Sequence, residues 1–132
     1  MRRVRWVKLM RLVTVSGVLL ASGACDWGPR GHGQLSGIVT PGAIPVGAVV
    51  LEISGPGVQG FSEVGQDRVF FAEPSSDVYR VVLVTDDSDQ IRFQVAVNDV
   101  RGPALTVVVV EAVDNNNVAI ADLSGIAVEI SR

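Results

Sequence analysis

The sequence predicts an all-β fold, a single antiparallel β-sandwich of about seven or eight strands. Short apolar runs with a period of two are separated by turn residues about every 8 to 12 positions. Twenty-one valines lie after residue 24, and their branched Cβ atoms favour extended backbone. No segment in this part of the chain combines helical periodicity with helix caps. Together these observations favour strands joined by turns.

The expected strands follow one another from residue 35 to the end of the sequence. Breaks such as Gly55-Pro56-Gly57, the acidic run 86–89 and the run 114–117 separate them, because glycine, proline, aspartate and asparagine suit turns. The expected strands are 35–40, 46–54, 58–64, 67–73, 78–85, 91–99 and 105–113, followed by the short runs 118–123 and 126–131. This number and spacing of strands are typical of immunoglobulin-like sandwiches.

Alternation predicts which strands have one buried face. Ile91, Phe93, Val95 and Val97 share one face of their strand, so we expect Phe93 in the core. The run 126–131 alternates in the same way. The run 106–110 is apolar on both faces, which predicts a strand in the middle of a sheet with cover on both sides.

The first 24 residues predict a cleaved signal peptide. Five basic residues and no acidic residue precede an apolar run of about ten residues, 12–21. A membrane-spanning helix needs about 20 such residues. Ser22-Gly23-Ala24 then offers small side chains to a signal peptidase.

Ser22-Gly23-Ala24-Cys25 resembles the lipobox of bacterial lipoprotein precursors, in which the cysteine becomes lipidated and N-terminal. The resemblance implies an exported protein whose lipid on Cys25 holds it in a bacterial cell membrane, either inner or outer. Two alternatives stay open. Ordinary cleavage after Ala24 would release a soluble exported chain, and an uncleaved segment would act as an anchor helix.

The remaining chain divides into a tether and one domain. Residues 25–33 hold the sole cysteine and a run rich in glycine, which predicts a short flexible tether before a domain at 34–132. From residue 25 onward there are six arginines, no lysine and fourteen Asp or Glu, a formal charge of −8. This acidic balance argues against binding to nucleic acid. A single cysteine also leaves no internal disulfide to stabilise the domain.

The residue types do not predict catalysis. The sole histidine, His32, lies in the tether between two glycines, where it cannot hold a fixed geometry with a nucleophile. We therefore expect no enzyme and no cofactor, with calcium as the one possible ion. Its candidate ligands are turn carboxylates, which hairpin turns also select for their backbone geometry. These candidates are Asp86, Asp87, Asp89, Asp99 and Asp114.

A glycan-binding module is a further alternative, because exposed aromatic rings stack on sugars. Phe70 and Phe71 are adjacent, so a strand would direct them to opposite faces, and one of the two should be exposed or covered by a loop. Ordinary packing of these rings is the competing interpretation.

From Ala48 to the end, the chain resembles cohesin-like β-sandwiches. The similar segments are VVLEISGPGV (49–58), IRFQVAV (91–97) and EAVDNNNVAIADLSGIAVEIS (111–131). The resemblance implies a non-enzymatic domain that binds a protein partner through a sheet face. A narrower segment, 37–54, is similar to the start of carboxypeptidase regulatory-like or transthyretin-like domains, which are also non-enzymatic sandwiches.

These expectations combine into one functional hypothesis. The sequence predicts a membrane-anchored, non-enzymatic lipoprotein of the cell envelope whose sandwich is a protein-binding or structural module. Its binding surface would be a sheet face or edge that includes segment 67–73 or 78–85.

Overall fold

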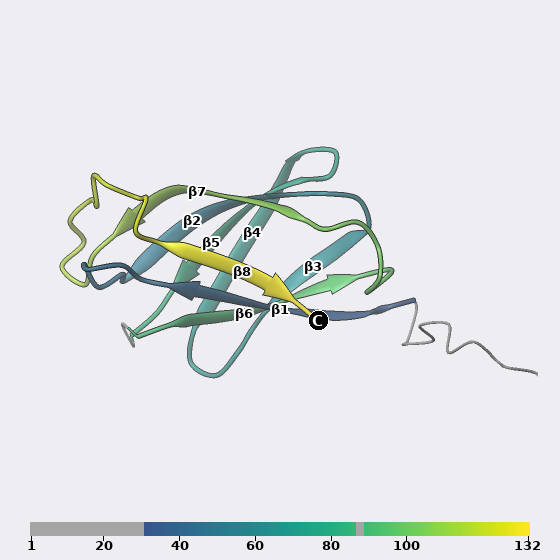
Figure 1. The fold of residues 1–132 in the computed structure, drawn as a ribbon, viewed down its shortest axis with the longest axis horizontal. Coiled ribbons are helices and arrows are strands. Elements are labelled where there is room, and N and C mark those ends of the chain that lie inside the picture. The colour runs from purple at the N-terminus through teal and green to yellow at the C-terminus, as the bar shows by residue number, and fades with distance from the viewer. Residues whose placement is uncertain (1–30, 87–88) are drawn as a thin grey trace, which may run out of the picture.

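The computed structural model describes residues 31–86 and 89–132, which form two antiparallel four-stranded sheets and no helix (Figure 1). The predicted all-β, antiparallel architecture is confirmed, and the arrangement is that of a β-sandwich. The strands are β1 (Gly33–Thr40), β2 (Ala48–Ser54), β3 (Val58–Glu63), β4 (Arg68–Ser75), β5 (Val78–Val84), β6 (Ile91–Val97), β7 (Thr106–Val113) and β8 (Ala127–Ser131). In this part of the chain there is no helix that is long and apolar enough to cross a membrane. The predicted signal peptide and residues 25–30 of the predicted tether lie outside the described residues.

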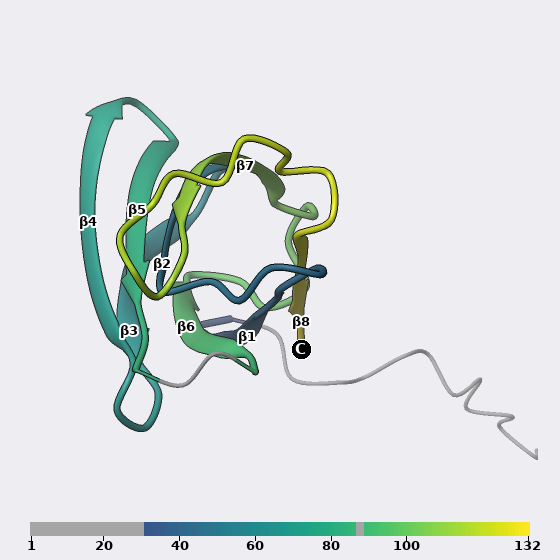
Figure 2. The ribbon, with the colours of Figure 1, turned by 90° about the vertical axis from the view of Figure 1, so that its left-hand side faces the viewer.

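Each sheet has two central and two edge strands. The first sheet has the order β3-β6-β1-β8 and the second the order β4-β5-β2-β7. Consecutive strands β3 and β4 are therefore edges of different sheets on one side of the molecule, and β7 and β8 are the edges on the other (Figure 2). The turn between β5 and β6 lies at one end of the sandwich, which we call the Thr85 end. The start of β1 lies at the opposite end, which we call the Gly33 end.

The core lies between the sheets, where the alternating apolar side chains meet. Phe93, Leu51 and Leu83 are among its largest fully buried side chains. The predicted inward face of β6 is confirmed, since its four apolar residues are all buried. Val128 and Ile130 of β8 pack against this core while they keep partial exposure.

Two predictions about individual segments are wrong. The run 106–110 does not lie mid-sheet, because it belongs to β7, an edge strand whose Val108 and Val110 side chains are 52% and 37% exposed. The run 118–123 does not form a strand. It makes one β-bridge, between Ala119 and Val113, and Ile120 from this loop fills the core. The apolar pattern of this run, which resembled a strand, is thus partly explained by the burial of Ile120 in a loop.

Candidate protein-binding face of the second sheet

The outer face of the second sheet carries apolar side chains on all four strands, interspersed with the charged residues Glu52, Arg68, Arg80 and Glu111. The register places Phe70 and Val50 opposite Val82, and Arg68 and Ala48 opposite Val84. The inward side chains of the same strands are the buried Val49, Leu51, Ile53, Tyr79, Val81 and Leu83. We call the outward-pointing set the valine face, defined by Val50, Phe70, Val82, Val84 and Val108.

The outer face of the first sheet has the opposite chemistry. Its central strands β1 and β6 direct Ser36, Arg92 and Gln94 outward, because their alternate residues Val39, Phe93 and Val95 are buried. Edge strand β8 adds Glu129 and Ser131 on the same side, as their partners in β1 require. The outer face of the first sheet is therefore mainly polar, with Ile38 as its one large apolar side chain on the central strands, and the outer face of the second sheet is richer in apolar side chains.

An ion pair lies on the same outer face as the valine face. Arg80 of β5 donates from Nε and Nη2 to Glu52 Oε2 of the neighbouring β2, at 3.3 and 3.1 Å. Both side chains are well exposed, at 47% and 37%, so solvent screens the pair and its contribution to stability is about 0 to 1 kcal/mol. Its main effect is to fix two polar groups among the apolar side chains of this face.

The two adjacent phenylalanines of β4 are both exposed, Phe70 at 58% and Phe71 at 49%. They point to opposite sides of the sheet, as predicted from their adjacency. Phe71 lies on the core side, where its ring centroid is 5.2 Å from that of Phe61, and Phe61 is 5.5 Å from Tyr79. These rings fill the gap between the edge strands β3 and β4. Phe70 has no such role and projects from the valine face.

Tyr79 anchors this group of rings through its hydroxyl, which donates to the Val58 carbonyl oxygen at 3.0 Å across the two sheets. The side chain is buried, and burial raises the pKa of the Tyr79 phenol above 10.0, with a further rise from the negative charges of Glu73 and Asp77. The hydroxyl therefore stays protonated and able to donate at neutral pH.

The predicted calcium ligands do not gather at one place. Asp86, Asp89 and Asp114 lie at the Thr85 end, whereas Asp99 follows β6 at the Gly33 end, one strand length or about 20 Å away. Asp87 lies outside the described residues. Within residues 31–86 and 89–132, no group of three or more His, Cys, Asp or Glu side chains could hold a metal ion.

Two of these carboxylates stabilise their own turns. Asp99 Oδ1 accepts a hydrogen bond from the Arg101 amide at 2.9 Å. Asp114 Oδ1 accepts from the amides of Asn116 and Val118 at 2.8 and 2.9 Å, in a loop where Asn117 has a φ of 60°. These are the turn roles for which aspartate and asparagine are selected.

Asp67 has a structural role that the sequence did not indicate. Its Oδ1 accepts from the Thr85 hydroxyl at 2.6 Å, and its Oδ2 accepts from the Arg92 amide at 2.9 Å. Because Thr85 follows β5 and Arg92 belongs to β6, one carboxylate connects the two sheets at the Thr85 end. No local motif marks such an aspartate, since its partners are distant in sequence.

The sole histidine and the predicted lipidation site lie at or before the start of the domain. His32 is exposed, and its Nδ1 is 3.4 Å from Gln59 Oε1. Cys25, the predicted lipidation site, lies outside the described residues.

Comparisons with known proteins return no relative. The chain matches no family model, no curated protein and no solved structure.

Proposed function

We propose that this chain is a non-enzymatic lipoprotein of the bacterial envelope whose valine face binds a protein partner. The observation that carries the proposal is the contrast between the two outer faces, since one is mainly polar and the other presents Phe70 and Val108 at 58% and 52% exposure. Phe70, Val82 and Val50 lie side by side across three strands, and Val108 lies beyond Glu52 on the same face. Apolar side chains gathered on one exposed sheet face are typical of an interaction site. Large aromatic side chains such as Phe70 are enriched in such sites.

The partner that we propose has an apolar surface surrounded by basic residues. The apolar centre of the valine face requires a matching apolar surface that excludes water. The formal charge of −8 after residue 24 would attract a basic partner and repel an acidic one during the encounter. A protein of the same membrane or envelope compartment would meet the face at high local concentration if the chain is anchored.

The type of sandwich is part of this proposal. The orders β2-β5-β4 and β3-β6 correspond to strands B-E-D and C-F of an immunoglobulin domain. In an immunoglobulin domain the first strand pairs with strand B and the last strand pairs with strand F. Here the two are exchanged, because β7 pairs with β2 and β1 pairs with β6. We therefore propose the cohesin-like type, the other sandwich that the sequence resembles.

We further propose that the chain is exported and anchored through a lipid on Cys25, as the lipobox-like sequence before it predicts. Metabolic labelling with an alkyne fatty acid tests this directly. The wild-type chain should incorporate the label and the variant Cys25→Ala should not. Equal labelling of both chains, or of neither, would refute the lipid anchor without bearing on the valine face.

Site-specific photocrosslinking tests the binding face in the intact cell. A photoreactive amino acid at Phe70 lies on the valine face, and the same amino acid at Gln94 lies on the polar face. We expect an adduct from position 70 and none from position 94. Val108→Glu should abolish the adduct, whereas the matched charge change Ala127→Glu, on the exposed outer side of β8, should leave it unchanged.

The mass of the adduct identifies the partner class. A heterologous protein that contains a basic surface supports the proposal. An adduct of twice the mass of the chain would show self-association and overturn it. The proposal is equally wrong if no adduct forms at either position while the labelled chains fold and localise normally.

A glycan is the second candidate ligand, because the Phe70 ring projects from a sheet face without a stacking partner among the described side chains. A glycan array with the purified chain and the variant Phe70→Ala distinguishes this alternative. Glycan binding that is lost in the variant would favour it over protein recognition.

A further inference from the structure

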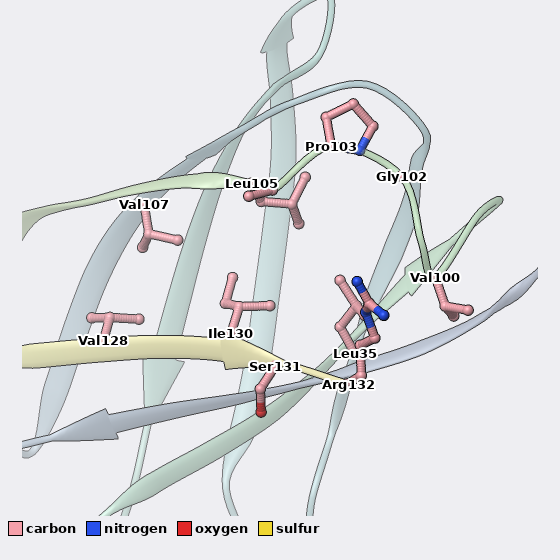
Figure 3. Close-up of a pocket in the computed structure, with 11 residues that line it drawn as sticks. Leu35, Val100, Gly102, Pro103, Leu105, Val107, Val128, Ile130, Ser131 and Arg132 are labelled. Carbon is pink, nitrogen blue, oxygen red and sulfur yellow. The ribbon is translucent and has the colours of Figure 1, made fainter. Parts of the chain in front are cut away.

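A hollow of about 450 Å³ lies at the Gly33 end, where the edge strands β7 and β8 of the two sheets diverge (Figure 3). Leu105 and Val107 line it from the second sheet, and Ile130 lines it from the first. Leu35 of β1 and Val100 of the loop after β6 complete its apolar wall. All five side chains are only half-buried, so the sandwich leaves part of its apolar interior open here.

The chain enters the domain at the wall of this hollow. The Val100 amide donates to the Gly31 carbonyl oxygen at 3.1 Å. The backbone of Gly33 lies directly against the Val100 side chain, where a Cβ atom would not fit. Gly31, the first described residue, therefore lies beside the opening.

Trp27 is the only aromatic residue between Cys25 and Gly31. Four residues of chain reach at most about 14 Å, which is enough to span the opening from Gly31. Gly28-Pro29 lies between them, a dipeptide that favours a reversal of the chain. The length of this segment is therefore sufficient for its one large apolar side chain to reach the hollow.

We propose that Trp27 docks into this hollow and fastens the N-terminal segment to the sandwich. An indole buries about 150 to 250 Å² of surface when it packs, and Leu35, Leu105 and Ile130 offer half-exposed surface to receive it. The Arg132 guanidinium extends across the hollow between Leu35 and Leu105 (Figure 3). A cation in this position stacks favourably on the face of an indole.

The docked segment would determine how an anchored domain stands on the membrane. This consequence, unlike the docking itself, rests on the proposed lipid at Cys25. A free segment from Cys25 to Gly33 could extend about 27 Å, whereas docking of Trp27 leaves only Asp26 between the docked residue and the lipidated Cys25. The Gly33 end would then face the membrane, and the valine face would stand at its side and remain accessible.

Tryptophan fluorescence tests the docking in the full chain. The chain has two tryptophans, so the variant Trp6→Phe makes Trp27 the sole emitter. We expect emission at a shorter wavelength than that of free tryptophan and a severalfold smaller acrylamide quenching constant. Ile130→Ser should move emission to longer wavelength and raise quenching severalfold. Leu123→Ser, at a half-buried position in the loop between β7 and β8 and outside the hollow, should leave both unchanged.

Three outcomes would overturn the proposal. Emission like that of free tryptophan would show an exposed indole. A short-wavelength emission that Ile130→Ser does not change would place the indole in detergent or another environment. A signal that disappears on dilution would indicate a second copy as the binding site.

Two further variants separate misfolding and lipid effects from docking. Circular dichroism of Ile130→Ser checks that its sheets are retained, and Trp27→Ser should lower the melting temperature without any change in the hollow itself. Cys25→Ala in the Trp6→Phe background should keep the short-wavelength emission. If the wild-type chain takes up no fatty-acid label and the short-wavelength emission is retained, the anchor is refuted and the docking is supported, so the two proposals fail separately.

Discussion

Gly37 of β1 is the position where one added methyl group should most clearly destabilise the sandwich. It is the register partner of Phe93, whose ring is fully buried and lies against the Gly37 backbone. A Cβ atom on Gly37 would be 2.6 Å from Cε2 of that ring and closer still to Cζ and Cε1. The ring cannot swing outward, because it is enclosed between the sheets.

Two opposing effects determine the size of the change in Gly37→Ala. Overpacking of a filled core costs about 1 to 3 kcal/mol. Replacing glycine by alanine reduces the entropy of the unfolded chain and returns about 0.4 to 1 kcal/mol. We therefore expect a net loss of about 1 to 2 kcal/mol in the free energy of unfolding, which lowers the melting temperature by roughly 10 °C in a domain of this size.

Gly60→Ala is the matched control for this substitution. Gly60 also lies in a strand of the first sheet, but the nearest atom to its added Cβ is Cζ of Phe71 at 3.7 Å, an ordinary contact. This variant should be neutral or more stable by up to about 1 kcal/mol. Urea denaturation of both variants measures the difference. The reasoning would be refuted if Gly37→Ala were as stable as Gly60→Ala. It would also be refuted if the losses of stability in Gly37→Ala and Phe93→Leu simply added in the double variant, because two residues in contact should not act independently.

Three further predictions concern polar groups. Tyr79→Phe removes the hydroxyl that donates to Val58 and should lower the free energy of unfolding by about 1 kcal/mol. Because burial raises the pKa of Tyr79 in the folded chain above 10.0, the wild type should also lose stability as the pH rises beyond that value. Urea titrations at high pH should find this loss reduced in the variant. Asp67→Ala removes two hydrogen bonds that connect the sheets and should cost about 1 to 3 kcal/mol, against less than about 1 kcal/mol for Asp99→Ala in its exposed turn; equal costs in thermal melts would contradict the role of Asp67. The hydrogen bonds from the Ser124 hydroxyl and amide lower the pKa of Asp122 below 3.8. The stability difference between the wild type and Asp122→Asn should therefore shrink as the pH falls through the lowered pKa. A constant difference between their thermal melts across the acid range would refute this prediction.

The sequence was informative wherever one face of a strand is buried and the other is polar. The alternation in β6 predicted its buried face and placed Phe93 in the core, because a period of two has one physical explanation in that strand. Turn residues marked most strand boundaries for the same local reason. The role of Asp67 and the placement of Asp99 away from the other acidic turns depend on strand order, and neither pattern nor spacing contains that order.

Strand β7 shows where such a pattern has two explanations. Apolar residues on both faces predicted a strand covered on both sides, but in the structure Val107 and Val109 pack against the core while Val108 and Val110 face outward from an edge strand. A strand with both faces buried in its own domain has the same sequence pattern as a strand with one face in the core and the other covered by a partner. In both cases valine replaces the polar residues of the second face. Central strand β5 has the same property in Val82 and Val84. The outward valines of β7 and β5 that lack a structural explanation in the described chain therefore form the surface for which we propose a partner, and a partner bound there would supply the second cover that the sequence of β7 predicts.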